Sequence, residues 1–326
     1  MKVIVTGAAG YVGAHVVESL LREGFEVHGI DDFSTGCAKF VNPDIRFSEL
    51  DICNTDSLVD LSRTMSPAGY IGIVHAAGVK FAGESSKRPG DFYRINSLGT
   101  LNILEFARQL EIENFVFSSS CSVYGTTTAS IPVDENTVLN PVSPYGRSKL
   151  YAEKIIEDFS VAHGISTLSL RYFNVAGNSA ITSFDSSPHN LFPNLYKSIC
   201  KSEPFSIYGK NYSTPDGTCI RDYVDVRTLS DAHAKALKEM IRGKKLPQAL
   251  NLGSGNGFSV LEIVETARKF LDGGLKHNFS EARIGDPAAI LADITLARKH
   301  IEWEHTFTLR EILTAGYEAW LRGQRN

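Results

Sequence analysis

The sequence lacks the features that would place the protein in a membrane or on a nucleic acid. None of its apolar runs approaches the about 20 residues that a membrane-spanning helix needs, and the apolar start is too short for a signal peptide. The net charge of −4 over 326 residues offers no electrostatic case for binding a polyanion or an anionic membrane. We therefore expect a soluble, cytoplasmic protein that binds neither nucleic acid nor membrane.

Cysteine is scarce and dispersed. No two cysteines have the C-x-x-C spacing typical of zinc or redox sites, and the nine histidines show no metal-ligand spacing either. We expect reduced thiols, with no disulfide framework and no metal. The five cysteines are Cys37, Cys53, Cys121, Cys200 and Cys219.

The first 31 residues have the pattern of a βαβ unit. A β-branched run at 2–6 predicts a strand, and G-A-A-G-Y-V-G at 7–13 predicts a tight loop after it. The residues that follow the loop predict a helix, and residues 25–30 predict a second strand. Glycines let the backbone approach a pyrophosphate at a helix N-terminus, where free N–H groups favour anions. The pattern thus predicts a dinucleotide site, although a glycine-rich turn in an unrelated α/β protein is the alternative.

Asp31 stands at the end of the second predicted strand, eighteen residues after Gly13. This spacing is typical of the acid that binds the adenosine ribose hydroxyls. A carboxylate there would repel a 2′-phosphate, so the sequence favours NAD over NADP.

Strands and helices go on alternating up to about residue 173, which predicts a parallel, doubly wound sheet of Rossmann type. Further strands are expected at Ile45–Leu50, Ile71–Gly78, Phe115–Phe117 and Thr167–Tyr172, with helices at 96–110 and 146–163.

The composition changes after Asn174, where Pro, Ser and Asn become more frequent. We expect residues 1–173 to form the NAD-binding domain and 174–326 mainly a smaller, mixed α/β substrate lobe, with segments around 220–250 returning to the first domain. Elements are predicted at Leu191–Lys201, 225–241, Ala249–Leu252 and Leu261–Leu271, the last capped by Ser259.

Tyr145 precedes Lys149 by four residues, so the two side chains share one face of a predicted helix. A lysine beside the phenol, together with an oxidised nicotinamide, would favour the phenolate, which can take a proton from an alcohol. A hydroxyl from the preceding serine-rich segment 118–122 would bridge the substrate oxygen and the phenol. The simpler alternative is a helix-start tyrosine with a solvated lysine.

Several segments, in this order, resemble the extended short-chain dehydrogenase/reductase family. They are T-G-A-A-G-Y-V-G, S-S-S-C-S-V-Y-G and Y-G-R-S-K. Four further segments are similar to the UDP-glucose 4-epimerases of that family: H-A-A-G-V-K-F-A-G-E-S (75–85), R-Y-F-N-V-A-G (171–177), T-P-D-G-T-C-I-R-D-Y-V-D-V (214–226) and N-L-G-S-G-N-G-F-S-V (251–260). The resemblance covers residues 1 to about 320.

The resemblance implies a role for each matching position. Tyr145 would be the acid and base, Lys149 would hold the nicotinamide ribose, and Ser120 would contact the sugar's 4-hydroxyl. The remaining cofactor residues would be Gly7, Gly10, Tyr11, Val12, Gly13, Asp31, Asp51, Ile52, Ala76, Ala77, Lys80, Asn96, Ser118 and Phe173. The UDP-sugar would be held by Lys80, Ser120, Tyr145, Asn174, Asn190, Tyr208, Arg221, Arg283 and Asp286. The family also implies a homodimer through the helices at 96–110 and 146–163.

The resemblance implies NAD-dependent inversion at C4 of UDP-glucose and UDP-galactose by transient oxidation to a 4-keto sugar, rotation and hydride return. An alternative is a UDP-N-acetylglucosamine or dual-specificity epimerase. Glucose-restricted bacterial relatives carry a tyrosine where this chain has Ile290, and that position either enlarges the sugar pocket or simply packs. A regulatory protein that senses a dinucleotide is the non-enzymatic alternative, and it would have no need of Tyr145 and Lys149.

Overall fold

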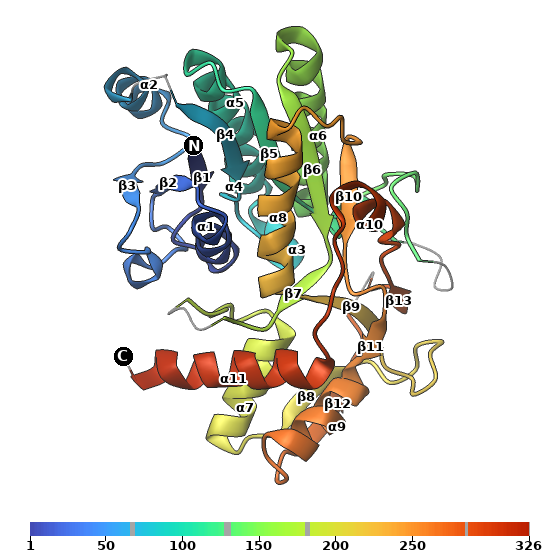
Figure 1. Ribbon diagram of the computed structural model, residues 1–326. Helices are drawn as coiled ribbons and strands as arrows, with labels where there is room; N and C mark the ends of the chain where they lie inside the picture. Colours follow the sequence, from blue (N-terminus) through green and yellow to red (C-terminus); the bar gives the residue numbers. More distant parts are fainter. Residues whose placement is uncertain (66–68, 127–131, 180–182, 284–285, 326) are drawn as a thin grey trace.

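The fold is built on one large parallel sheet, with a smaller lobe below it (Figure 1). The computed structural model describes residues 1–65, 69–126, 132–179, 183–283 and 286–325. The large sheet has seven strands in the order β10-β6-β5-β4-β1-β2-β3, all parallel, which confirms the predicted Rossmann-type fold. Its strands are β1 (Lys2–Thr6), β2 (Glu26–Asp31), β3 (Arg46–Glu49), β4 (Tyr70–His75), β5 (Asn114–Ser120), β6 (Ser166–Tyr172) and β10 (Ala249–Leu252).

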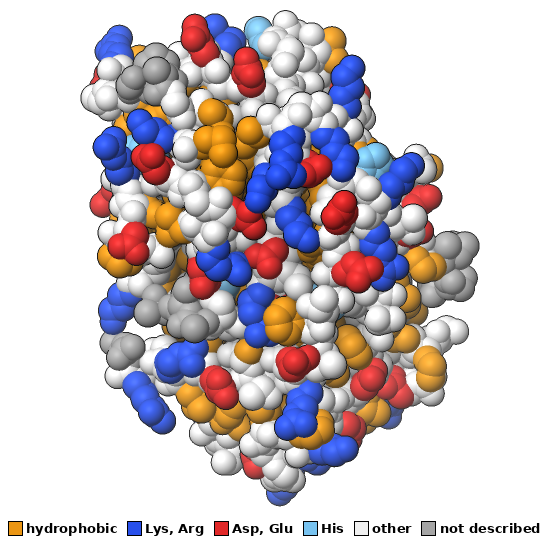
Figure 2. Space-filling view, in the orientation of Figure 1, with side chains coloured by type: hydrophobic (Ala, Val, Ile, Leu, Met, Phe, Trp, Pro, Cys, Tyr) orange, Lys and Arg blue, Asp and Glu red, His pale blue; other side chains and the backbone are white. Residues whose placement is uncertain are grey.

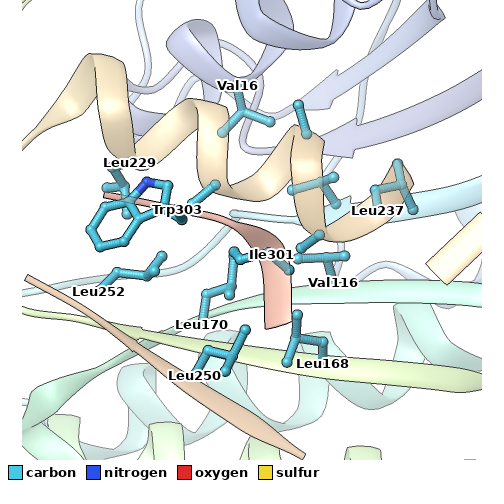
Figure 3. Packing of buried hydrophobic residues seen from close by; sticks show 14 of the residues in the cluster. Val16, Val116, Leu168, Leu170, Leu229, Leu237, Leu250, Leu252, Ile301 and Trp303 are labelled. Atoms are coloured by element: carbon cyan, nitrogen blue, oxygen red, sulfur yellow. The ribbon is translucent and has the colours of Figure 1, made fainter. Parts of the chain in front are cut away.

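One face of the large sheet is covered by α1 (Tyr11–Arg22), α8 (Val226–Ile241) and α10 (Thr295–Ile301). Figure 3 shows Val16 of α1 and Leu229 and Leu237 of α8 over the strand residues Val116 and Leu170. Trp303 closes this layer, fully buried, with its indole N–H donating to the main-chain oxygen of Thr228 at 2.7 Å.

The other face is covered by α2 (Thr55–Thr64), α5 (Gly99–Gln109) and α6 (Pro144–His163). Leu104 of α5 and Ala152 and Ile156 of α6 pack with Phe115 and Phe117 of β5 in a separate buried cluster. A π-helical stretch, η2 (Tyr93–Leu98), leads into α5. Short elements complete this domain: η1 (Ala38–Phe40), α3 (Ala82–Lys87), α4 (Pro89–Phe92) and η3 (Cys121–Val123).

The smaller lobe has its own core between two short sheets and three helices. Strand β9 pairs with β7, β11 and β13, and β8 pairs in parallel with β12. The strands are β7 (Asn174–Ala176), β8 (Phe205–Tyr208), β9 (Ile220–Asp225), β11 (Gly257–Ser259), β12 (His277–Ser280) and β13 (Ala289–Ile290), and the helices are α7 (Leu191–Lys201), α9 (Val260–Phe270) and α11 (Leu309–Arg325). Apolar residues of α7, α9 and α11 fill the space between them.

Two differences from the predicted elements have clear physical causes. Strand β5 extends to Ser120, beyond the predicted Phe117, because the hydroxyls of Ser118 and Ser119 find buried partners in His233 and Glu153. Helix α6 begins at Pro144 because Ser143 caps it, accepting from the Gly146 N–H at 3.1 Å, and proline is favoured in the first turn. Ser259 caps α9 as expected.

The surface carries charges of both signs. In the view of Figure 2, acidic and basic side chains alternate over the molecule and no extended patch of one sign is visible. None of the helices in the described part of the chain is both long enough and apolar enough to traverse a bilayer.

Candidate active site

The glycine loop after β1 is held against the start of α1 without room for a side chain. Gly7 has φ +72°, and a Cβ at Gly13 would lie 1.9 Å from the main-chain oxygen of Gly7. Gly10 occupies the N-cap position and offers no side-chain cap, so the first-turn N–H groups of α1 at Tyr11, Val12 and Gly13 have no side-chain acceptor from that residue. A pyrophosphate suits such donors and such a close backbone.

Asp31 lies at the end of β2 and ties the glycine loop to the sheet. Its carboxylate accepts from the Ala9 N–H at 3.0 Å and from the Phe33 N–H at 2.9 Å. It is only 8% exposed, and burial raises its pKa from the ordinary value. Each oxygen retains a further lone pair, which a ribose hydroxyl would use.

The loops after β3 and β4 place the other predicted cofactor residues at the same edge. Asp51 accepts from the Cys53 N–H at 2.8 Å, and Ile52 beside it is buried. After β4, the Ala77 N–H donates to Thr6 at 3.2 Å, which draws Ala76 and Ala77 to the end of β1.

Asn96 joins the loop after β4 to helix α6. Its amide accepts from the Val79 N–H at 2.9 Å and donates to the Val79 carbonyl at 3.0 Å and to Ser148 of α6 at 2.9 Å. Lys80, the next residue in the loop, is about half exposed, and its ammonium lies 3.5 Å from the Asp185 carboxylate. The loop is therefore fixed by Asn96 while Lys80 reaches toward the smaller lobe.

Ser120, Tyr145 and Lys149 meet where β5 ends and α6 begins. The Ser120 hydroxyl accepts from the Ser122 N–H at 3.2 Å and lies beside the phenol of Tyr145, and the ring of Phe92 lies edge-on to Tyr145 with centroids 6.2 Å apart. Lys149 is buried and donates from Nζ to the main-chain oxygen of Ser118 at 2.9 Å. The structure thus brings together the predicted hydroxyl, phenol and ammonium.

Burial works against the ionised phenol. It raises the pKa of Tyr145 to about 12, and the neighbouring Ser120 side chain lowers it only in part. Burial also lowers the pKa of Lys149 to about 8. The predicted joint effect of Lys149 and an oxidised nicotinamide on the phenol stays a prediction, and it has to offset this burial, which spacing on a helix does not reveal.

Four predicted substrate residues gather in the smaller lobe. The Arg221 guanidinium donates to Asp286 at 2.7 Å, and the Asp286 N–H donates to the carbonyl of Arg283. The guanidinium of Arg283 lies 4.4 Å from the ring centre of Tyr208, which is exposed. Two cations beside an open aromatic ring suit a nucleotide diphosphate, which binds guanidinium groups through paired hydrogen bonds.

The remaining predicted positions lie between the two lobes. Phe173 is buried directly after β6, and Asn174 begins β7, where its amide donates to the Asp222 carbonyl at 3.0 Å. Asn190 is the N-cap residue of α7 and donates to Asp185 at 2.7 Å. No sequence signal indicated Asp185, because its segment matches no motif, yet its carboxylate contacts both Asn190 and Lys80.

Ile290 lies in β13, beside Arg221 of β9, and belongs to the buried cluster under α8. It is 8% exposed, as expected of a packing residue. Burial raises the pKa of the Cys121 thiol to about 12 and also raises that of Cys219, so neither cysteine is an activated nucleophile.

Known proteins share both the sequence and the fold. The model of the NAD dependent epimerase/dehydratase family matches residues 3–253. This chain belongs to that family. A UDP-glucose 4-epimerase of Lactobacillus helveticus is 39% identical over 308 residues, which cover 93% of this chain and 92% of that protein.

Solved structures agree over the whole chain. A UDP-glucose-4-epimerase of Stenotrophomonas maltophila with bound NAD and formylated UDP-arabinopyranose has a TM-score of 0.93 at 28% identity, covering 100% of this chain and 99% of that one. A UDP-glucose 4-epimerase of Brucella ovis with NAD has a TM-score of 0.90 at 32% identity and 98% coverage of both chains. The UDP-Glc/GlcNAc 4-epimerase of Campylobacter jejuni has a TM-score of 0.84 at 29% identity, covering 98% of this chain and 99% of that one. NAD is therefore the cofactor of this chain's family, and the side-chain-free cradle of Gly7, Gly10 and Gly13 fits it.

Proposed function

We propose that this protein interconverts UDP-glucose and UDP-galactose by inverting C4. The observation that carries the proposal is the meeting of three groups where β5 ends and α6 begins: the Ser120 hydroxyl, the neighbouring Tyr145 phenol, and Lys149 one turn further along α6, which donates to the Ser118 carbonyl at 2.9 Å. A regulatory protein that only senses a dinucleotide would have no use for a phenol and a hydroxyl paired at this point. Relatives named UDP-glucose 4-epimerase support the choice of substrate.

The chemistry requires a base that can also act as an acid. Bound NAD supplies the acceptor that takes hydride from C4 and returns it. Tyr145 takes the proton of the 4-hydroxyl while C4 is oxidised, and Ser120 holds the same oxygen. The 4-keto sugar then rotates, so that hydride returns to the opposite face of C4. Tyr145 gives the proton back to O4. The hydride and the proton taken from the substrate are both returned to it within one turnover, so the reaction needs no other reductant.

The smaller lobe anchors the half of the substrate that does not react. Arg221 and Arg283 present two guanidinium groups for the diphosphate, and Tyr208 offers an exposed ring for a base. When the binding energy comes from contacts to UDP, the sugar remains free to rotate about its link to the diphosphate. The inversion then follows because hydride leaves and returns on one side only, while the rotated 4-keto sugar presents the opposite face of C4 to it.

The test is turnover of UDP-galactose carrying deuterium at C4, with wild-type protein and the Tyr145→Phe variant. We expect the label to remain at C4 of the UDP-glucose formed, and Tyr145→Phe to lower kcat by about 100- to 10,000-fold. Tyr151→Phe is the matched control, because Tyr151 is an exposed tyrosine on the same helix. Label lost to solvent, or full activity of Tyr145→Phe, would contradict the proposal.

A second candidate is a dual-specificity enzyme that also accepts N-acetylated UDP-hexoses. Ile290 lacks the hydroxyl and the bulk of the tyrosine found in glucose-restricted relatives, and the Campylobacter jejuni neighbour is named for both sugars. Its burial favours plain packing, so we rank this candidate second. Rates on UDP-galactose and UDP-N-acetylgalactosamine, measured side by side, decide between the two.

We also propose that the protein works in the cytoplasm as a homodimer formed through α5 and α6. Tyr151 of α6 is half exposed and stacks on Tyr93 of η2. Two further apolar side chains of the same elements are exposed, Leu98 of η2 and Val161 of α6. Light scattering after gel filtration tests the dimer. We expect twice the chain mass for the wild type and the chain mass for Tyr151→Glu, and a monomeric wild type would refute this part.

A further inference from the structure

Three consecutive residues of β5 each contact a different residue of one face of α6. The Ser118 carbonyl accepts from Lys149, the Ser119 hydroxyl donates to Glu153, and the Ser120 side chain lies beside the phenol of Tyr145. Residues 145, 149 and 153 are spaced one helical turn apart and therefore share a face. Two hydrogen bonds thus join the strand end to the start of the helix beside the Ser120–Tyr145 contact, and of the three helix residues only Glu153 is outside the proposed catalytic set.

Glu153 is buried and bound on two sides. Ser119 donates to its Oε1 at 2.5 Å, while Arg171 of β6 donates from Nε at 3.0 Å and from Nη2 to Oε2 at 2.7 Å. Both ion-pair side chains are 8% exposed. A two-point guanidinium–carboxylate pair of this kind has a fixed geometry, unlike an exposed ion pair.

Arg171 is itself held from behind. Its Nη1 donates to the Tyr124 hydroxyl at 3.1 Å, and that hydroxyl donates to Asn251 of β10 at 2.7 Å. The Asn251 N–H in turn donates to Glu135 at 2.7 Å. Because Arg171 is anchored to β6 and β10 in this way, it fixes the position of Glu153 rather than moving with it.

We propose that the buried Glu153–Arg171 pair is a positioning device that sets Tyr145, Lys149 and Ser120 relative to one another by fixing α6 against the end of β5. The inference rests on the proposed function for the roles of Tyr145 and Lys149, and it adds residues that the family resemblance and the proposed reaction do not assign.

The pair also bears on the charge of Lys149. The groups that face its ammonium are Glu153 from the same helix, His75 from β4, and the ring of Phe117 from β5, whose centre lies 4.7 Å away. Burial and the charge of Lys149 lower the pKa of His75 to about 3, so this histidine is neutral. Glu153 is the neighbour that raises the pKa of Lys149 against the effect of burial.

The first variant for a test is Glu153→Gln, which keeps the size and the hydrogen-bonding oxygen but removes the charge. We expect kcat to fall about 10- to 100-fold with KM unchanged, because a displacement of reacting groups costs rate rather than substrate binding. The pKa of Lys149, followed by NMR of ¹³Cε-labelled lysine and assigned with Lys149→Met, falls by about one pH unit. Ser119→Ala lowers kcat without changing that pKa. Glu157→Gln, one turn further along α6 in an exposed ion pair, changes neither quantity.

A second variant keeps the inference testable if a lone charge unfolds the protein. Removing one partner of a buried pair is strongly destabilising, whereas apolar residues in place of both are often neutral. Glu153→Met/Arg171→Leu should therefore retain the wild-type melting temperature, and we expect it to lose kcat as Glu153→Gln does. Wild-type kcat in this folded double variant overturns the inference. If the wild type itself does not turn over UDP-sugars, the proposed function fails, and the NMR titration of Lys149 still tests the coupling to Glu153.

Discussion

Lys149 donates its ammonium hydrogen bond to the main-chain oxygen of Ser118, 2.9 Å away on the neighbouring strand. This bond holds the buried amine at the end of β5, next in sequence to Ser119 and Ser120. The lysine thereby links the helix to the strand as well as serving the proposed chemistry, and its removal has two separable consequences.

Replacing Lys149 by methionine should stabilise the folded protein near neutral pH while abolishing turnover. Burial lowers the pKa of Lys149 from 10.5 to about 8, so the unfolded chain binds more protons between these two values. Stability of the wild type therefore rises with pH across that window, and below it the buried ammonium carries its full cost.

For nucleotide-stripped protein at pH 7, we expect Lys149→Met to raise the free energy of unfolding by about 1–3 kcal/mol, with the gain shrinking above pH 8. Urea unfolding at several pH values measures it. Lys154→Met, at an exposed lysine of the same helix, should show no such pH dependence. A variant less stable than wild type by the same amount at every pH would contradict this account.

The Gly13→Ala variant should lose its nucleotide. The added Cβ would lie 1.9 Å from the Gly7 carbonyl oxygen, so the loop and α1 must move apart where the pyrophosphate would approach. We expect the purified variant to release no NAD on denaturation, where the wild type releases about one per chain.

Gly273→Ala is the control for that change. No heavy atom lies within 4 Å of its added Cβ, and its φ is not positive, so nucleotide content and melting temperature should stay at wild-type values. Full NAD content in Gly13→Ala would show that the loop does not hold the dinucleotide.

Arg221→Lys should weaken substrate binding more than it slows chemistry. Lysine keeps the positive charge but not the forked geometry that pairs with Asp286 and would pair with a diphosphate. We expect KM for UDP-galactose to rise about tenfold with kcat within about twofold, measured by steady-state kinetics. The same exchange at the exposed Arg298 should change neither constant. A lower kcat with unchanged KM would place Arg221 at the reacting end instead.

Ile290→Ala should reveal a packing role. Truncation of a buried isoleucine costs about 2–5 kcal/mol, and Ile290→Val about 0.5–1.5 kcal/mol. Chemical denaturation measures both values. Unchanged stability, combined with a new preference between plain and N-acetylated substrates, would instead identify Ile290 as a wall of the sugar pocket.

The parts of the fold that follow local patterns could be predicted from sequence. Strand β1, helix α7 and strand β10 lie at the predicted residues, because each has a clear apolar period and a turn residue at its ends. The parallel pair of β8 and β12 could not be predicted, since it joins segments about seventy residues apart and no local signal specifies that register.

The candidate site divides in the same way. Residue types and spacing identified Tyr145, Lys149 and the glycine loop, because these chemistries require particular atoms at particular intervals. Arg171 opens the segment R-Y-F-N-V-A-G, but no motif pairs it with Glu153, because the two meet only after β6 has paired with β5 and α6 has packed on both. Burial, which determines the acidity of Tyr145, is likewise a property of the assembled layers.

The route of the chain between the two lobes has a consequence for how the molecule can be divided. After β6 the backbone enters the smaller lobe, it comes back as α8 and β10, crosses again to β11 and α9, returns as α10, and ends below as α11 (Figure 1). Neither lobe is therefore formed by one continuous segment of the chain. A fragment cut at residue 173 would leave the layer beneath α8 and Trp303 bare, and a substrate lobe grafted from a relative would bring along part of its host's sheet. New sugar preferences in this scaffold must arise by point changes rather than by exchange of halves.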